Sequence, residues 1–192
     1  MAFSAIGKVK VAAHAALFFV NILVLAFSTR VNHFQEFYFM ADLFPFGLSI
    51  VTLILLTITI ALDFAVENSY TGRAQFEIGH FGLLSIFWLA FNSFSTSRWR
   101  MIPFQCNSIP SDFSEERGWC KDVQALKGLV WVEFFMCFVT ALMTLRYTFT
   151  QYSRGNKHIF QMPLSRYHPE LLFGQKLTYG RDSEFLQFEK LT

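Results

Sequence analysis

Four long apolar stretches separated by short polar ones dominate this sequence of 192 residues. A helix that crosses a bilayer needs about 20 mostly apolar residues, because the hydrocarbon core is about 30 Å thick and a helix rises about 1.5 Å per residue. Four stretches meet this requirement, and charged residues or short polar loops bound them: residues 11–28, 40–62, 78–95 and 126–145.

The composition agrees with a chain that lies mostly in lipid. Hydrophobic residues make up 53% of the chain and charged residues 16%, whereas a soluble domain carries about 25% charged residues. The 25 phenylalanines insert readily into hydrocarbon. A net charge of +2 is too small to indicate a nucleic-acid partner.

We therefore predict an all-α membrane protein with a four-transmembrane-helix antiparallel bundle. The connections at residues 29–39 and 63–77 are too short for separate domains, and residues 96–125 form a larger loop of mixed charge. We expect residues 1–150 to form the membrane domain and residues 151–192 to form a cytosolic tail. A cleaved secretory signal is the competing interpretation of the first stretch. Its 18 apolar residues exceed the usual 7–15, and Asn21 interrupts them.

The orientation depends on lysine, arginine and cysteine. With cytosolic termini, ten of the sixteen basic residues lie on the cytosolic side and six on the other. Without three distant tail residues the count is seven against six, so the positive-inside rule favours cytosolic termini only slightly. Cys106 and Cys120 share the larger loop and would form a disulfide in an oxidising compartment. Two free cytosolic thiols are the alternative, and a zinc site would need more ligands than this loop has.

Glu133 is the most informative polar residue, because it lies inside the fourth stretch. A carboxylate at depth is costly unless it is neutral, paired or hydrated. Its structural interpretation is a hydrogen bond that fixes the register of the bundle, with His14, Asn21 or Asn92 as partner. Its functional interpretation is an ion or headgroup site, or a proton-linked switch.

Motifs for catalysis are weak in this chain. Glu77 and His80 form one Glu-x-x-His pair, whereas a di-iron bundle needs two such pairs and two further glutamates. The sequence shows no Ser-His-Asp set, phosphate loop or dinucleotide fingerprint. We therefore expect no catalytic residues, no metal and no cofactor, and a protein that is not an enzyme.

The tail is basic where it leaves the membrane. Arg154, Lys157 and Arg166 would each gain about 1 kcal/mol from an anionic leaflet. Residues 185–191 repeat apolar side chains at roughly helical spacing, which indicates either a short interfacial helix or a solvated, mobile segment.

Several stretches together resemble fungal MARVEL-domain proteins: residues 77–92 (EIGHFGLLSIFWLAFN), Cys106, the pair Trp119-Cys120, and residues 124–129 (QALKGL). The resemblance covers residues of about 8–150 and excludes the tail. It implies a four-helix module associated with ordered lipid domains, membrane apposition and vesicle trafficking. Claudins differ by a long first extracellular loop, and tetraspanins by a Cys-Cys-Gly motif in a much larger last loop.

Three functions compete at this point. The leading hypothesis is a non-enzymatic protein of the plasma membrane or secretory pathway that organises lipids or serves as a trafficking scaffold. Its partners would be membrane lipids and either further copies of itself or other membrane proteins. The alternative is a channel, transporter or auxiliary subunit, which Glu133, His14, Asn21 and Asn92 would support. A membrane enzyme acting on lipid rests only on Glu77 and His80.

Overall fold

The computed structural model describes residues 4–66, 69–100, 102, 105–110, 112–155, 159–160 and 162–164. These residues form four long α-helices and one short 3-10 helix: α1 (Ala5–Phe34), α2 (Met40–Ala65), α3 (Ala74–Trp99), η1 (Cys106–Ser108) and α4 (Ser114–Ser153). Each long helix is sufficiently long and apolar to cross a membrane. The prediction of an all-α bundle of four transmembrane helices is confirmed.

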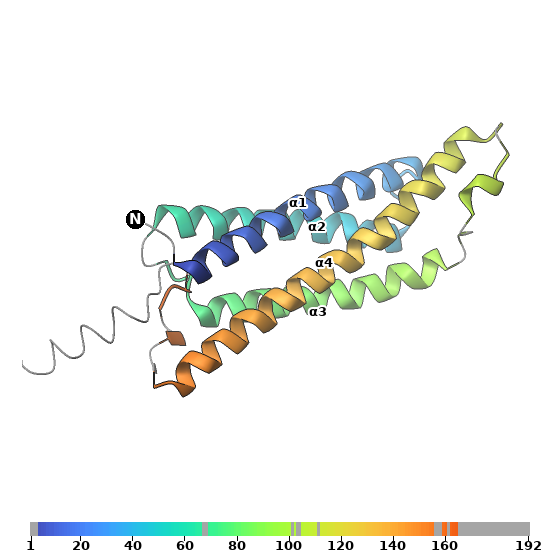
Figure 1. Cartoon of the computed structure of the whole chain (residues 1–192). Coiled ribbons are helices and arrows are strands. Elements are labelled where there is room, and N and C mark those ends of the chain that lie inside the picture. Colours follow the sequence, from blue (N-terminus) through green and yellow to red (C-terminus); the bar gives the residue numbers. More distant parts are fainter. Residues whose placement is uncertain are drawn as a thin grey trace, which may run out of the picture.

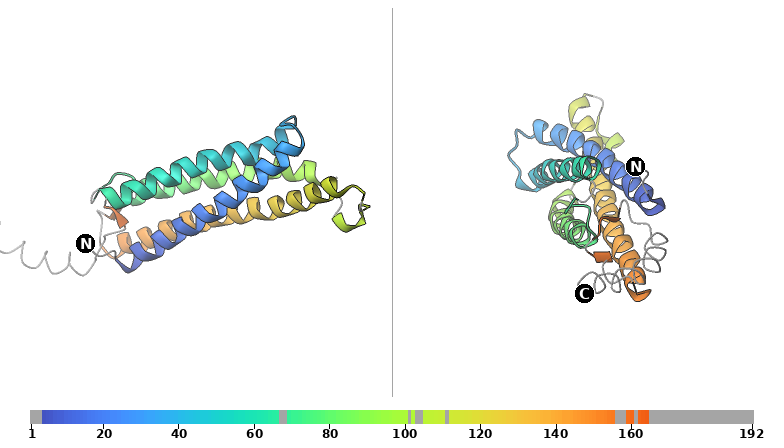
Figure 2. Two further views of the ribbon diagram at one scale, coloured as in Figure 1. Left: turned by 90° about the horizontal axis from the view of Figure 1, so that it is seen from above. Right: turned by 90° about the vertical axis from the view of Figure 1, so that its left-hand side faces the viewer.

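The four helices run side by side along one common direction, with successive helices antiparallel (Figure 1). α1 packs against α2 and α4, and α3 packs most extensively against α4 (Figure 2). We call the end with Ser4, Ala65, Ala74 and Ser153 the terminal end, and the end with Phe34, Met40, Trp99 and η1 the loop end.

The helices extend beyond the apolar stretches that predict them. α1 has 30 residues and α4 has 40, against predicted segments of 18 and 20. At about 1.5 Å per residue α4 is roughly 60 Å long, twice the thickness of a hydrocarbon core. The larger loop expected at residues 96–125 is therefore partly wrong, because α4 already begins at Ser114.

Local sequence explains how the first two helices begin. The Ser4 side chain accepts a hydrogen bond from the Gly7 amide at 3.0 Å and caps α1. Pro45 lies in α2 and has no amide hydrogen to give to Ala41, four residues earlier. The Ser95 hydroxyl of α3 donates to the Ala41 carbonyl instead, at 2.6 Å. This contact between α2 and α3 satisfies the carbonyl that Pro45 leaves without a hydrogen-bond donor.

The main core is an apolar cluster along the bundle axis, and every long helix contributes to it. Its fully buried members include Leu17, Leu56, Trp88, Leu126 and Val130. A second, smaller cluster lies at the terminal end, where Ile159 and Leu164 pack with Ala74. The Leu164 amide donates to the Gly72 carbonyl at 3.1 Å, so the first part of the expected tail belongs to the packed structure.

Candidate functional site

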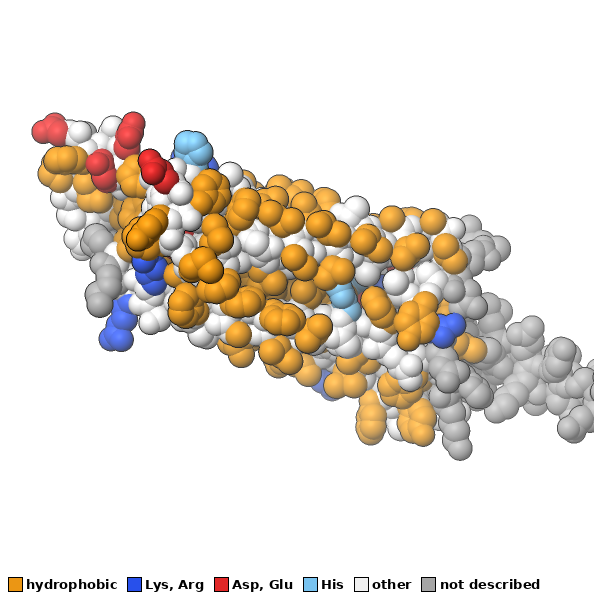
Figure 3. Space-filling model, turned by 180° about the vertical axis from the view of Figure 1, so that it is seen from behind, with side chains coloured by type: hydrophobic (Ala, Val, Ile, Leu, Met, Phe, Trp, Pro, Cys, Tyr) orange, Lys and Arg blue, Asp and Glu red, His pale blue; other side chains and the backbone are white. Residues whose placement is uncertain are grey.

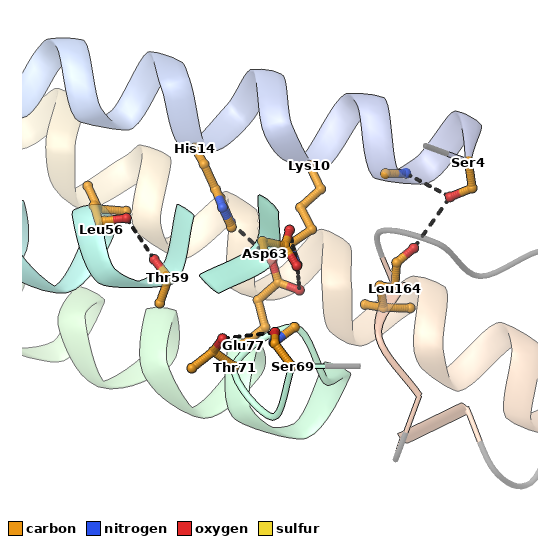
Figure 4. Close-up of polar contacts among 12 residues, drawn as sticks. Ser4, Lys10, His14, Leu56, Thr59, Asp63, Ser69, Thr71, Glu77 and Leu164 are labelled. Atoms are coloured by element: carbon orange, nitrogen blue, oxygen red, sulfur yellow. Dashed lines mark hydrogen bonds and ion pairs between the residues drawn. The ribbon is translucent and has the colours of Figure 1, made fainter. Parts of the chain in front are cut away.

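A cluster of four ionisable side chains joins three helices at the terminal end (Figure 4). Lys10 of α1 places its Nζ 3.2 Å from Asp63 Oδ2 of α2 and 3.6 Å from Glu77 Oε2 of α3. His14, one turn beyond Lys10, places its Nε2 3.0 Å from Glu77 Oε1. We call these four residues the ion-pair cluster.

The ion-pair cluster is almost closed to solvent. None of its side chains is more than 8% exposed. The backbone also comes close to it, because a Cβ added at Gly72 would lie 2.8 Å from Asp63 Oδ1. A side chain at this point of the α2–α3 connection would therefore press on the Asp63 carboxylate, which would have to shift beside Lys10.

Helical spacing brings these residues together. Lys10 and His14 are four residues apart and share one face of α1. Asp63 lies in the last turn of α2 and Glu77 in the first turn of α3, so the short connection returns both carboxylates to the same end. When both carboxylates are ionised, Lys10 balances one of the two negative charges, and a protonated His14 would balance the other.

The Glu-x-x-His pair does not act as a unit. His14 of α1, rather than His80, faces Glu77. The His80 ring stacks on Phe76 at 5.7 Å, and its buried Nε2 has no hydrogen-bond partner among the described residues. No group of three or more possible metal ligands of the His, Cys, Asp or Glu type occurs in the described part of the chain.

Glu133 is buried in the interior, but the partners expected for it are wrong. The side chain is 0% exposed, and neither carboxyl oxygen has a hydrogen-bond partner in the described structure. His14 contacts Glu77, while Asn21 donates to the Ser49 carbonyl at 2.8 Å. Asn92 donates to the Val130 carbonyl at 2.7 Å, one turn from Glu133. Each amide thus links two helices without using the carboxylate.

A second polar cluster closes the loop end around Asp42, which is 1% exposed. Asp42 accepts a hydrogen bond from the Trp99 indole and lies 3.5 Å from the Arg98 Nε. Asn32 of α1 donates to the Asp42 carbonyl at 2.7 Å. These residues, which we call the Asp42 cluster, connect α1, α2 and α3. An outer ion pair joins Arg30 to Asp122 at 3.1 Å.

The disulfide between Cys106 and Cys120 is present in the structure and links η1 to α4, with a Cα–Cα distance of 5.7 Å. Cys137 is a buried free cysteine in α4. Of the three basic residues predicted to contact anionic lipid, Arg154 is exposed at the end of α4. Lys157 and Arg166 lie outside the described residues, as do residues 185–191.

Sequence reasoning missed Lys10, Asp63 and Asp42 as members of polar clusters. Lys10 and Asp63 directly flank the predicted spans at residues 11–28 and 40–62, and charge usually marks the end of an apolar stretch. One signal was available. A lysine at the start of one predicted span, an aspartate at the end of the next and a glutamate before the third all lie at the same end of an antiparallel bundle.

Comparison of the chain with protein-family models, with curated proteins and with solved structures finds no match. The resemblance to MARVEL-domain proteins therefore stays a prediction. The fold and the three polar features, namely the ion-pair cluster, Glu133 and the Asp42 cluster, are the grounds on which a function is inferred.

Proposed function

We propose that this chain is a non-enzymatic integral membrane protein that organises lipids or membrane domains, as a scaffold in membrane trafficking. One observation carries the proposal: the buried ionisable groups lie at separate places along the bundle, with uncharged polar and apolar side chains between them, whereas the outer surface is broadly apolar. Such a protein has much surface for lipid and little for aqueous chemistry.

The buried ionisable groups among the described residues lie far apart along the bundle, with uncharged polar side chains such as Asn92 and apolar side chains between them. The bond from Asn92 to Val130 fixes the register of α3 against α4. At about 1.5 Å per residue, Glu133 lies roughly 18 Å along the axis from Glu77 and roughly 15 Å from Trp99. Leu17, Leu56, Phe81, Leu84 and Trp88 are buried in the core that surrounds this middle region. Direct proton or ion transfer between these ionisable groups would have to cross such distances.

The exterior is suited to lipid. Large hydrophobic side chains are exposed on all four helices, and Figure 3 shows hydrophobic side chains over most of the visible length of the bundle. Examples from successive helices are Phe19 at 62%, Ile54 at 54%, Ile86 at 64% and Phe135 at 56% exposure. Exposed apolar area of this extent indicates a membrane or a partner surface.

The proposal includes an orientation. A disulfide persists in an oxidising compartment. The loop end, which carries Cys106 and Cys120, would then face the exoplasmic side, and the terminal end with the ion-pair cluster would face the cytosol. This orientation fits a protein of the plasma membrane or the secretory pathway.

A channel, transporter or auxiliary subunit is the second candidate. The ion-pair cluster and Glu133 favour it, because ionisable groups inside a membrane often mark ion or proton pathways. The separation of these groups along the bundle argues against it for a single copy of the chain.

The deciding experiment compares lipid organisation with transport in the same preparation. The purified chain is reconstituted into vesicles that contain coexisting ordered and disordered lipid phases, and ion flux is measured alongside phase area. We expect the protein to partition unequally between the ordered and disordered lipid phases and to change the area of each phase. Ion flux should equal that of protein-free vesicles. Selective flux that Glu133→Gln abolishes would establish the second candidate instead.

A further inference from the structure

A cleft of about 700 Å³ opens at the loop end, where α2, α3 and the start of α4 meet. Most of the side chains that line it are apolar, and one is cationic: Met40, Ala41, Phe94, Ile102, Trp119 and Arg98. Met40 and Phe94 are 63% and 55% exposed, so the apolar side of the cleft faces outward from the bundle. The cleft therefore combines a surface for hydrocarbon with a single positive charge.

Arg98 is held in place from two sides. Its Nε lies 3.5 Å from Asp42 Oδ2, and its guanidinium carbon lies 3.6 Å from the centroid of the Phe39 ring. Asp42 is itself fixed by the Trp99 indole. A guanidinium supported in this way loses little conformational entropy when it binds a further group.

The Arg98 side chain is 37% exposed, and it meets Asp42 through its Nε. The Nε1 of Trp119, in the same lining, is a buried donor with no acceptor among the described residues. The cleft thus presents hydrogen-bond donors, and an anionic oxygen group would complement them.

The depth of the cleft also indicates its ligand. Trp99 and Trp119 lie at the loop end of the bundle, and tryptophan is enriched at the boundary between hydrocarbon and water. Arg98 lies at the same level, where lipid phosphates occur. Met40 and Phe94 are apolar side chains of the same lining, and an acyl chain would lie against them.

We propose that this cleft binds one glycerophospholipid, with its phosphate against the guanidinium of Arg98 and an acyl chain along Met40 and Phe94. The inference rests on the proposed function, because it names a lipid that the protein would hold. A sterol would supply only a hydroxyl, which forms a weaker hydrogen bond with a guanidinium than an anionic phosphate does. Free phosphate would satisfy Arg98 but would gain nothing from the apolar lining.

The test is native mass spectrometry of the full chain in mild detergent, titrated with dioleoyl phosphatidylglycerol. Dioleoylglycerol, which has the same acyl chains without the phosphate, and inorganic phosphate serve as competitors. Arg98→Gln removes the cation, and Ser97→Trp fills the cleft while leaving Arg98 beside Asp42. Arg100→Gln is the matched control, because Arg100 is an exposed arginine outside the lining.

We expect the wild-type chain and Arg100→Gln to retain one phosphatidylglycerol that neither competitor displaces. Ser97→Trp and Arg98→Gln should each weaken retention at least about tenfold, in line with the loss of a charge-assisted contact. Equal retention by the wild type and Ser97→Trp would overturn the inference, as would displacement by dioleoylglycerol. If the wild type still changes lipid phases while binding no phospholipid here, the proposed function survives and only this inference fails.

Discussion

At the scale of single residues, Glu133 is the group whose placement differs most from expectation. A buried carboxyl was expected to bond to a neighbouring helix, yet the amides that could have served it bond to backbone carbonyls instead. A single sequence gives the depth of a polar residue in a span, but it does not give the rotation of each helix about its axis. The rotation decides which polar groups meet, and it follows from the packing of all four helices together.

The effect of a substitution at Glu133 depends on whether its carboxyl has partners. With partners, Glu133→Gln would be mild and an apolar substitution worse. Because neither oxygen has a described partner, an apolar residue of similar volume should remove an unfavourable buried group. We expect Glu133→Met to raise the free energy of unfolding by about 1 kcal/mol, and Glu133→Gln to leave it nearly unchanged.

Unfolding in mixed micelles by a denaturing detergent would measure both variants against the wild type. A loss of stability in Glu133→Met would mean that the carboxyl makes a favourable contact in the membrane. A gain in stability combined with a loss of cellular function would show that Glu133 is retained for a role other than stability.

The ion-pair cluster gives a second prediction at this scale. Lys10→Met removes the cation that faces both Asp63 and Glu77, and leaves two carboxylates close together in a site that is almost closed to solvent. We expect a loss of about 3 kcal/mol in the free energy of unfolding, the range for breaking a buried ion pair. The matched control is Lys8→Met, because Lys8 is exposed two residues earlier on the same helix.

The same unfolding assay measures this pair of variants. If both lysine variants lost equal stability, the effect would come from charge near the membrane surface and not from the cluster. Asp63→Asn in the background of Lys10→Met should recover part of the loss, since it removes one of the two negative charges that the lysine compensates.

At the scale of elements, hydropathy located every helix but underestimated its length. The apolar stretches end where charges begin, at Lys10, Asp63 and Glu77. In the structure these charges lie inside helices because they neutralise one another across the bundle. Hydropathy scores each residue alone, so it cannot recognise that a charge at one span end has its partner at another. The helical start of α4 was missed for a related reason, since residues 114–125 are polar and were assigned to a loop.

The disulfide stabilises the loop end by closing a short segment of the chain. It closes a segment with a sequence separation of 14 residues, and in the chain-entropy model this is worth about 3 kcal/mol. We expect Cys120→Ser to lower the free energy of unfolding by about this amount, and reduction of the wild type to have the same effect. Mass spectrometry of alkylated, non-reduced peptides should find Cys106 linked to Cys120.

Cys137 provides the internal control for this measurement. It is a free cysteine with no exposed surface, so it should react with alkylating reagents only after unfolding. Labelling of Cys106 or Cys120 in intact cells by a reagent delivered to the cytosol would contradict both the disulfide and the proposed orientation.

At the scale of the whole molecule, the described residues expose large hydrophobic side chains on all four long helices. We expect the chain to form homo-oligomers or lateral arrays, because helix surfaces in lipid associate through packing and hydrogen bonds. Native mass spectrometry of the chain in nanodiscs made from cell membranes would measure the assembly directly. A strictly monomeric species at cellular protein density would refute this expectation.

The hydrogen bond from the Ser4 hydroxyl to the Leu164 carbonyl spans 160 residues of sequence, at 3.4 Å. It has a consequence for biosynthesis. The start of α1 enters the bilayer early, yet its cap cannot complete its contacts until residue 164 has left the ribosome. Synthesis proceeds at about 5–20 residues per second, so the terminal end stays unfinished for roughly 6 to 26 seconds after α1 is made. During the first part of that interval, until Asp63 and Glu77 have been made, the buried lysine and histidine of α1 also lack their carboxylate partners. The nascent chain is thus most open to chaperones, and to quality control, on the side of the membrane where the segment around Leu164 will later contact the start of α1.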